Sequence, residues 1–345
     1  MPASCSLVVV NYRSASLAIE AIRSARAAIQ SPMQVIVVDN SVDAREAEAL
    51  KSHTDILIVA DTNLGYGAAV NRARAKCDGD ALLVCNPDVR FGPNSIDPLL
   101  DADADVAGPA LFWDDAYQWL LPPSEIRSAA EAFDAAMASR SVRWRRSRDR
   151  HRIQERIVFW SLSAPTRVSA VSGAVMAIRR AAFDRAGGFD ERFHLYFEEI
   201  DLQRRIPAGS IVYIPNARCR HLYNQSAGKS AAAAAEFARS EMQYLEKWSG
   251  KYIANWIKRI ERPVTPAAVE RLTDGIVLER TNVVIEASPL ASFETAAGHF
   301  PSALRVDVPA EVWESYLGEA LYLRVVDRDA ARVLATYVKT RISRA

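Results

Sequence analysis

Carboxylates occur in two segments of the chain whose patterns favour different chemical roles. Asp88 follows the apolar run ALLVC and the pair Asn86-Pro87, so it stands at the end of a predicted strand. A carboxylate in that place can bind Mg²⁺ or Mn²⁺, and the cation can neutralise a phosphate group. Glu198 and Glu199 begin EEIDLQRR, a short predicted element, where either side chain can accept a proton from a hydroxyl. The two segments together suggest group transfer from a phosphate-bearing donor.

The first hundred residues contain the elements that must position Asp88. Short apolar runs at 6–10, 34–41, 56–61 and 81–89 are typical of buried parallel strands. The segments between them, 14–29, 44–53 and 67–77, have the pattern of helices. This alternating order predicts an α/β fold: a Rossmann-like, mostly parallel open sheet with helices on both faces.

Polar residues follow each of these strands at the point where it ends. They are Asn11-Tyr12, Asp39-Asn40-Ser41, Asp61-Asn63 and Asn86-Asp88. In open parallel sheets, ligands bind beyond the carboxyl ends of the strands. The four clusters are therefore expected to converge on one edge and to form a single site.

Residues 62–73, TNLGYGAAVNRA, add a turn that contains glycine and precedes the third helix. Gly65 and Gly67 allow a ligand to approach the backbone closely, and the start of a helix favours a nearby anion. The pattern is not GxGxxG, so by itself this turn is a weak signal.

Five segments, VVVNY, VIVVDNS, TNLGYGAAVNRA, ALLVCNPDV and SGAVMAIRRAAFDRAGGFDERFHLYFEEIDLQRR, together resemble the family 2 glycosyltransferases. The resemblance is to the rhamnosyltransferase-like bacterial branch and covers roughly residues 5 to 226. It implies a GT-A fold, a nucleoside-diphosphate sugar donor, inverting transfer, and a divalent cation, Mg²⁺ or Mn²⁺, as cofactor.

The resemblance also implies roles for residues at the ends of the strands. Donor and nucleotide binding falls to Tyr12, Asp39, Asn63, Gly65, Asn86, Asp88 and Asp190. Tyr12 and Asp39 would hold the base; the alternative is that Tyr12 packs in the fold and Asp39 caps a turn. Asn86 stands where many GT-A enzymes have the first residue of Asp-x-Asp, so Asp88 alone must supply the carboxylate.

The same resemblance places the metal at Asp88 and His221, with Ser226 completing the site, although a lone histidine is more often structural. Glu199 occupies the position of the usual catalytic aspartate, which is a departure from the family motif. A glutamate is one methylene longer, and a displacement of ~1 Å can lower a rate about a hundredfold. Glu198 is therefore the alternative base.

The remainder of the chain is harder to interpret. Residues 1–262 are expected to form the GT-A domain, with an irregular, basic insertion at 110–165, and residues 263–345 a small β-rich domain. Arg143–Arg152 contains six arginines, and it could contact a membrane or a phosphate-bearing acceptor, or be a solvated helix face. A helical stretch is predicted from about 231 to 262, where prolines end it.

Composition narrows the class of protein. The 345 residues are 50% hydrophobic with a net charge of +1, so nucleic acid is not an expected partner. Four cysteines without CxxC spacing fit a reducing compartment. No signal peptide or membrane span is recognisable, which predicts a cytoplasmic protein, peripheral at most on the inner face of the membrane. The sequence leaves room for a homodimer.

These observations predict an inverting, metal-dependent glycosyltransferase. It would move a sugar, rhamnose by resemblance, to a bacterial surface glycan or a lipid-linked saccharide acceptor. The alternative is a non-catalytic sugar-nucleotide or glycan-binding scaffold of a polysaccharide assembly complex. Nucleotidyl transfer is disfavoured, because VVVNYRSAS has no glycine-rich loop after the first strand.

Overall fold

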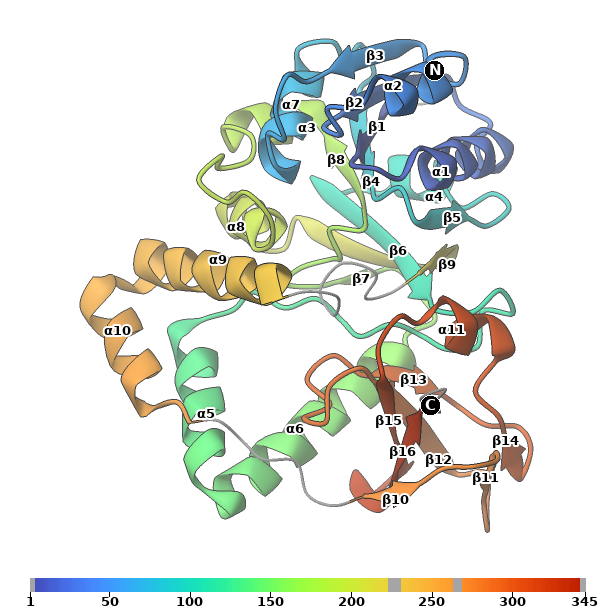
Figure 1. Cartoon of the computed structure of the whole chain (residues 1–345), viewed down its shortest axis with the longest axis vertical. Helices are drawn as coiled ribbons and strands as arrows, with labels where there is room; N and C mark the ends of the chain where they lie inside the picture. Colours follow the sequence, from blue (N-terminus) through green and yellow to red (C-terminus); the bar gives the residue numbers. More distant parts are fainter. Residues whose placement is uncertain (1–3, 223–230, 263–268, 342–345) are drawn as a thin grey trace.

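The computed structural model describes residues 4–222, 231–262 and 269–341, and a nine-stranded sheet runs through its N-terminal part (Figure 1). Eight of the strands follow one another in the order β3-β2-β1-β4-β8-β6-β9-β5. The first four pair in parallel and are β3 (Ile56–Val59), β2 (Met33–Asp39), β1 (Cys5–Asn11) and β4 (Ala81–Cys85). These are the four strands that the sequence predicts.

The other half of the sheet mixes orientations. Its strands are β8 (Val175–Arg179), β6 (Val106–Phe112), β9 (Ile211–His221), β5 (Val89–Phe91) and β7 (Thr166–Arg167). β8 is antiparallel to β4 and β6, whereas β6 and β9 are parallel. β5 pairs antiparallel with β9, so the chain segment after Asp88 lies beside the segment that ends at His221.

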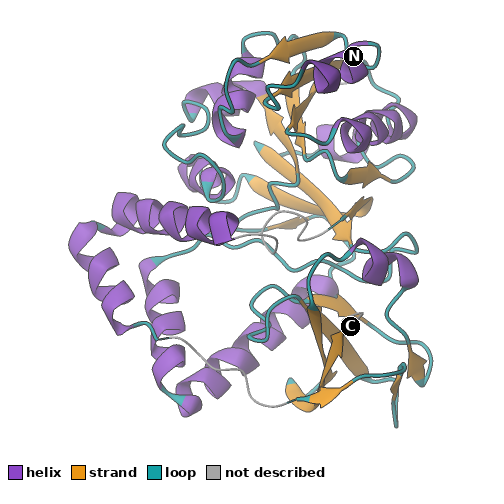
Figure 2. Cartoon of the chain, in the orientation of Figure 1, coloured by secondary structure: helices purple, strands orange, loops and turns teal. Residues whose placement is uncertain are grey.

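Helices cover both faces of this sheet, as predicted (Figure 2). Leu7 and Val9 of β1 point into one core with Ile22, and Val8 points into the other with Val70. Because both faces are buried, the strand is apolar at successive positions. The helices are α1 (Ala15–Ala28), α2 (Ala44–Lys51), α3 (Tyr66–Arg74), α4 (Asp97–Leu100), α7 (Arg180–Arg185) and α8 (Glu198–Arg205).

The segment 110–165 is not the irregular insertion that the sequence predicts, because most of it is helical. It contains α5 (Ala129–Arg140) and α6 (Val142–Trp160). Ser128 and Glu131 form a capping box at the start of α5, and the Ser141 side chain caps α6. Arginines replace the apolar residues that normally mark a helix, so this segment lacks the usual helical period.

The predicted helical stretch at 231–262 consists of two helices. They are α9 (Ala231–Ser249) and α10 (Lys251–Ile260), which meet at an angle (Figure 1). Gly250 between them has a φ of 82°, a left-handed conformation that glycine adopts without strain. This glycine therefore redirects the chain from α9 into α10.

The C-terminal region is β-rich, as predicted. One sheet has the order β10-β16-β15-β12-β13, and β11 pairs with β14. The elements are β10 (Glu270–Arg271), β11 (Ile276–Val277), β12 (Val283–Ser288), β13 (Ala297–His299), β14 (Arg305–Val306), α11 (Ala310–Ser315), β15 (Ala320–Asp327) and β16 (Arg332–Thr340). Its apolar core is continuous with that of the large sheet through Trp113, Trp119 and Tyr316. Arg156 of α6 also reaches Glu286 of β12 at 2.7 Å, with both side chains buried.

Candidate active site

Asp39 at the end of β2 is fully buried, and the described residues supply hydrogen bonds to one of its carboxylate oxygens. Its Oδ1 accepts hydrogen bonds from Asn11 Nδ2 at 2.9 Å and from the Ser41 N–H at 3.0 Å. Its Oδ2 has no hydrogen-bond partner among the described residues. Asn11 is in register with Asp39, so Tyr12 follows β1 beside it, and the Tyr12 side chain is half exposed. An aromatic ring and a free carboxylate oxygen suit a nucleobase that carries a ring N–H.

The turn before α3 holds Gly65 in a conformation that other residues resist. Gly65 has a φ of 83°, and a side chain there would meet the His194 carbonyl oxygen at 2.4 Å. Asn63 Oδ1 accepts a hydrogen bond from the Gly65 N–H, and Asn40 Nδ2 donates to the Gly65 carbonyl. The turn is thus fixed between the end of β2 and the loop that precedes α8.

Asp88 and His221 lie side by side, although they are far apart in the sequence. The Asp88 Oδ1 and His221 Nε2 atoms are 3.3 Å apart, and both side chains are largely buried. The antiparallel register of β5 and β9, in which Val89 faces His221, creates this pair. Ser226, the third residue of the predicted metal site, lies outside the described residues.

Glu198 and Glu199 form the first turn of α8. The Oε2 atom of each is buried without a hydrogen-bond partner among the described residues. Burial raises the pKa of Glu198 well above the ordinary range, and the Glu199 charge adds to the effect. Burial also raises the pKa of Glu199, against the opposing effect of backbone N–H groups at the helix start. Such a pair resists ionisation, and its proton affinity is higher than that of an ordinary glutamate.

The residues just before α8 have an unusual backbone. Tyr196 and Phe197 have φ values of 69° and 68°, in the left-handed region that side chains rarely adopt. Phe197 packs against Tyr244 of α9, at 5.4 Å between ring centroids. Packing therefore stabilises a strained turn that sets the direction of Glu198 and Glu199, as strained backbone often does at functional sites.

The loop 172–174 joins the Asp88 segment to the glutamates. Asn86 N–H donates to the Ala174 carbonyl oxygen at 2.9 Å. A side chain on Gly173 would come within 2.8 Å of Glu199 Cγ, so Glu199 lies directly against this glycine. The segments of Asp88 and Glu199 are thus neighbours across one short loop.

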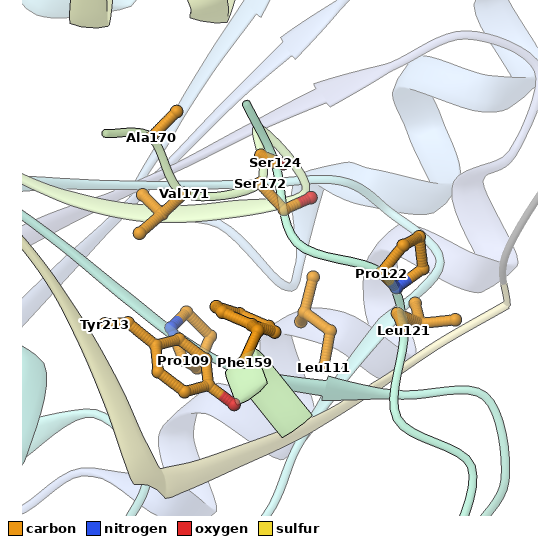
Figure 3. A pocket seen from close by; sticks show the side chains of 10 residues that line it. All are labelled: Pro109, Leu111, Leu121, Pro122, Ser124, Phe159, Ala170, Val171, Ser172 and Tyr213. Atoms are coloured by element: carbon orange, nitrogen blue, oxygen red, sulfur yellow. The ribbon is translucent and has the colours of Figure 1, made fainter. Parts of the chain in front are cut away.

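A small cavity lies behind this loop (Figure 3). It measures about 20 Å³ and is lined by Ser172 together with Pro109, Phe159 and Tyr213. A cavity of this size has room for about one water molecule and not for a nucleotide. It therefore belongs to the packing that supports the loop.

Tyr66 is a site residue that sequence analysis missed. Its hydroxyl is 3.4 Å from the Gly173 carbonyl oxygen. Burial raises the pKa of Tyr66, and the charges of Glu198, Glu199 and Asp88 contribute. The hydroxyl thus lies within electrostatic range of all three carboxylates. The sequence feature that could have identified Tyr66 is its position between two glycines at the start of a predicted helix.

Asp190 and Asp201 are held differently, in an ion-pair network. Lys247 Nζ of α9 lies 2.7 Å from Asp190 Oδ2 and 2.6 Å from Asp201 Oδ1. Arg192 also binds both Asp190 oxygens, and these bonds lower the pKa of Asp190, the Arg192 hydrogen bond most strongly. Arg205 pairs with Asp201 at 3.0 Å. Asp201 is therefore a buried carboxylate that pairs with both Arg205 and Lys247.

The basic segment Arg143–Arg152 divides between inward and outward side chains. Arg148 pairs with Asp134 and Glu294, and Arg152 with Glu125 and Glu294. The outward group comprises Arg143, Arg146 and Arg150, which are exposed and make no ion pair within the described residues. Two of the six arginines, Arg148 and Arg152, therefore join α6 to the C-terminal region through Glu294.

The described residues contain no cluster of three or more metal-binding side chains. Asp88, just before β5, and His221, at the end of β9, offer one carboxylate oxygen and one imidazole nitrogen. Mg²⁺ and related ions commonly take one or two protein ligands, with phosphate oxygens and water completing the shell. This donor set therefore fits a cation that a diphosphate brings with it.

Comparison with known proteins identifies the family of the chain. Residues 6–171 match the model of Glycosyl transferase family 2. Two curated proteins of Mycobacterium tuberculosis (strains CDC 1551 / Oshkosh and ATCC 25618 / H37Rv) are named N-acetylglucosaminyl-diphospho-decaprenol L-rhamnosyltransferase. Each is 34% identical to the chain over 231 residues, which cover 60% of the chain and 72% of the relative.

Solved structures resemble this chain at low sequence identity. A crystal structure of GalNAc-T7 with UDP, GalNAc and Mn²⁺ has a TM-score of 0.50 and 12% identity, covering 99% of this chain and 72% of that one. Staphylococcus aureus TarS 1–349 in complex with UDP has a TM-score of 0.44 and 14% identity, covering 74% and 69%. The similarity to GalNAc-T7 supports the GT-A fold.

Among the described residues, no helix is long and apolar enough to span a membrane.

Proposed function

Because the chain belongs to family 2 of the glycosyltransferases, we propose that it transfers a sugar with inversion from a nucleoside-diphosphate donor to a lipid-linked saccharide. One observation carries this proposal. The segment that carries Asp88 and the turn that carries Glu199 both contact the loop 172–174, which supports a cation site at Asp88 and His221 beside a base at Glu198 or Glu199. Inverting transfer needs these two groups on opposite sides of the reacting carbon.

The donor base is assigned to Tyr12 and Asp39. The free Asp39 Oδ2 is buried, and a buried acceptor without a partner costs about 1–3 kcal/mol. A nucleobase N–H would satisfy it, while the half-exposed Tyr12 ring stacks on the base. Asn63 and Gly65 shape the adjoining turn, whose position at the start of α3 favours the diphosphate.

Asp88 and His221 would hold the divalent cation. When bound, the ion neutralises charge that develops on the departing diphosphate. Mixed carboxylate and imidazole ligation suits Mn²⁺ at least as well as Mg²⁺. Asn86 fixes the loop through its backbone bond to Ala174.

Glu199 is assigned as the base. Its carboxylate accepts the proton of the acceptor hydroxyl, while the hydroxyl oxygen forms a bond to the anomeric carbon. The bond from that carbon to the diphosphate oxygen breaks on the opposite side, and the diphosphate leaves with the electron pair. Gly173 gives space to the longer side chain, since a Cβ there would overlap Glu199. Glu198 is almost entirely buried, which favours Glu199 as the residue that meets the acceptor.

Asp190 takes a positioning role in this proposal. Arg192 and Lys247 already engage both of its oxygens, so its carboxylate ties the loop before α8 to α9. It would act on the donor through the loop, whereas the sequence pattern favours direct contact.

The sugar and acceptor are proposed from the relatives. Proteins 34% identical to this chain are named as L-rhamnosyltransferases that act on N-acetylglucosaminyl-diphospho-decaprenol. We assign this chain a rhamnose-type donor and an N-acetylglucosaminyl-diphospho-lipid acceptor of the same class. Such an acceptor would bring the protein to the cytoplasmic face of a membrane.

The test is transfer from a panel of nucleotide sugars, including dTDP-rhamnose, to an N-acetylglucosaminyl-diphospho-lipid, with Mg²⁺, Mn²⁺ or chelator. We expect metal-dependent use of one donor, and a loss of at least about a hundredfold in Asp88→Ala, because the leaving diphosphate loses its counter-charge. Asp55→Ala, an exposed carboxylate away from the site, serves as the control. If donors bind with wild-type saturation and none is consumed, the chain is a non-catalytic scaffold and the proposal fails.

A further inference from the structure

Four large apolar side chains lie exposed where α10 meets α5 and α6. This aromatic surface consists of Trp144, Tyr252, Ile253 and Trp256, with exposures of 40%, 93%, 48% and 52%. Trp256 stacks on Phe133 of α5 at 5.3 Å between ring centroids, and Trp144 meets the edge of the same ring. The four side chains therefore belong to one continuous surface.

The apolar arc of α10 is wider than the part that the fold covers. Ala254 and Ile257 are buried against α5 and α9. Ile253 and Trp256, three residues apart and so on one side of the helix, border this buried face but remain exposed. Tyr252, one turn before Trp256, is almost fully exposed. A helix whose only role is to pack inside the protein does not need exposed apolar residues beside its buried face.

Three cations surround the aromatic surface. Lys251 precedes Tyr252, Arg259 lies one turn after Trp256, and Arg143 precedes Trp144. None of the three makes an ion pair within the described part of the chain. The neighbouring acid Asp134 is occupied by Trp144 Nε1 and Arg148. Glu261 is occupied by Lys258.

The aromatic surface is one helix away from the catalytic turn. Lys247 and Trp248, in the last turn of α9, contact Asp201 of α8. The chain then turns at Gly250 into α10, which begins the aromatic surface (Figure 1). Whatever binds to the aromatic surface would therefore be held close to α8.

We propose that this aromatic surface binds the headgroup region of a bilayer that contains anionic lipid. Tryptophan and tyrosine favour the membrane–water interface, and an amphipathic helix with basic residues on its polar side lies in the interfacial plane. Each lysine or arginine near an anionic surface adds to the attraction. The binding surface differs from the one expected from Arg143–Arg152 alone, because it is centred on α10. Membrane binding would bring the protein to a lipid-linked acceptor, and only this last step rests on the proposed function.

Co-sedimentation of the full chain with vesicles tests this proposal, using phosphatidylglycerol mixed with phosphatidylcholine and phosphatidylcholine alone. We expect binding to the anionic vesicles, a loss of about tenfold or more in Tyr252→Ser/Ile253→Ser, and a similar loss in Lys251→Glu/Arg259→Glu. The double variant Val277→Ser/Leu304→Ser removes exposed apolar side chains of the C-terminal region and should bind as wild type. All variants should transfer normally to a short-chain, water-soluble acceptor.

Other outcomes separate the surface from the enzyme. Vesicle binding that is unchanged in both α10 variants, or absent in the wild type while transfer proceeds, overturns the surface and leaves the function standing. A dimer seen by sedimentation velocity and dissociated by Tyr252→Ser/Ile253→Ser also overturns it, because the surface would then join two copies. Binding by the wild type without any transfer upholds the surface and refutes the function.

Discussion

Two pairs of acids in one short segment, Glu198–Glu199 and Asp190–Asp201, have opposite surroundings. The glutamates each keep a buried oxygen without a hydrogen-bond partner among the described residues. The aspartates share Lys247, and each has an arginine of its own. Burial raises the pKa of both glutamates, whereas ion pairing lowers the pKa of Asp190.

This difference in surroundings separates carboxylates that can act as a base from carboxylates that hold the fold together. A carboxylate that is saturated by cations is a poor base, because its proton affinity is low and its oxygens are occupied. A buried carboxylate with a free oxygen is unfavourable for the fold, and it persists where function requires it. The aspartates thus fix the loop and α9 around the glutamates, which remain available for a proton.

The largest effect is expected from Glu199→Gln. Losing the base should lower kcat by about 10²–10⁴-fold, the usual contribution of general base catalysis. Calorimetric titration with the donor nucleotide should give an affinity close to that of the wild type, because Glu199 is assigned to the acceptor side. Glu48→Gln, an exposed carboxylate on α2, is the matched control and should keep its activity. Full activity in Glu199→Gln would move the base to Glu198.

The second prediction concerns Asp190 and Asp201, whose carboxylates are bound by Lys and Arg side chains. Asp201→Ala leaves Arg205 without its counter-charge and Trp248 Nε1 without its acceptor, and Lys247 keeps only Asp190. We expect a loss of about 3–5 kcal/mol in the free energy of unfolding, the size found when one partner of a buried pair is removed. The urea midpoint measures it.

The control for that experiment is Asp190→Ala. Its main partner, Arg192, is 70% exposed, so solvent screens the pair and the loss should be smaller. Equal losses for the two variants would contradict the view that burial sets the strength of this network.

The smallest predicted effect is a gain in the free energy of unfolding and not a loss. Glu198→Gln should raise stability by about 1 kcal/mol near pH 8, because it removes a charge that burial disfavours. The folded-state pKa of Glu198 is raised, so the wild type loses stability as pH rises from the ordinary glutamate range towards that raised value. The advantage of the variant should therefore shrink near pH 5.5, as thermal unfolding at the two pH values would show. An advantage that grows on acidification would contradict the account.

Much of the sheet could be predicted from sequence, because its evidence is local. The apolar runs ending at Asn11, Asp39 and Cys85 identify β1, β2 and β4, and the polar residues after them locate the site edge. The proximity of His221 to Asp88 depends on antiparallel pairing between distant strands. Only the resemblance to a family, and no spacing rule, predicted that proximity.

The rest depends on tertiary contacts that leave no local pattern. Arg156 makes α6 appear polar, and it is buried only because Glu286, 130 residues later, pairs with it. Lys247 gives no sign that it joins Asp190 to Asp201. Tyr66 looks like an ordinary aromatic residue until the fold brings Gly173 to its hydroxyl.

The most direct test of the central claim is the pH dependence of kcat/KM for the proposed rhamnosyl transfer, measured at saturating Mn²⁺ or Mg²⁺. If the Glu198–Glu199 pair supplies the base, activity falls as pH decreases through the raised pKa of the pair. The acidic limb should then lie clearly above 4.5, the ordinary value for glutamate. An acidic limb at or below that value would show that the base is an ordinary exposed carboxylate, and would contradict the assignment.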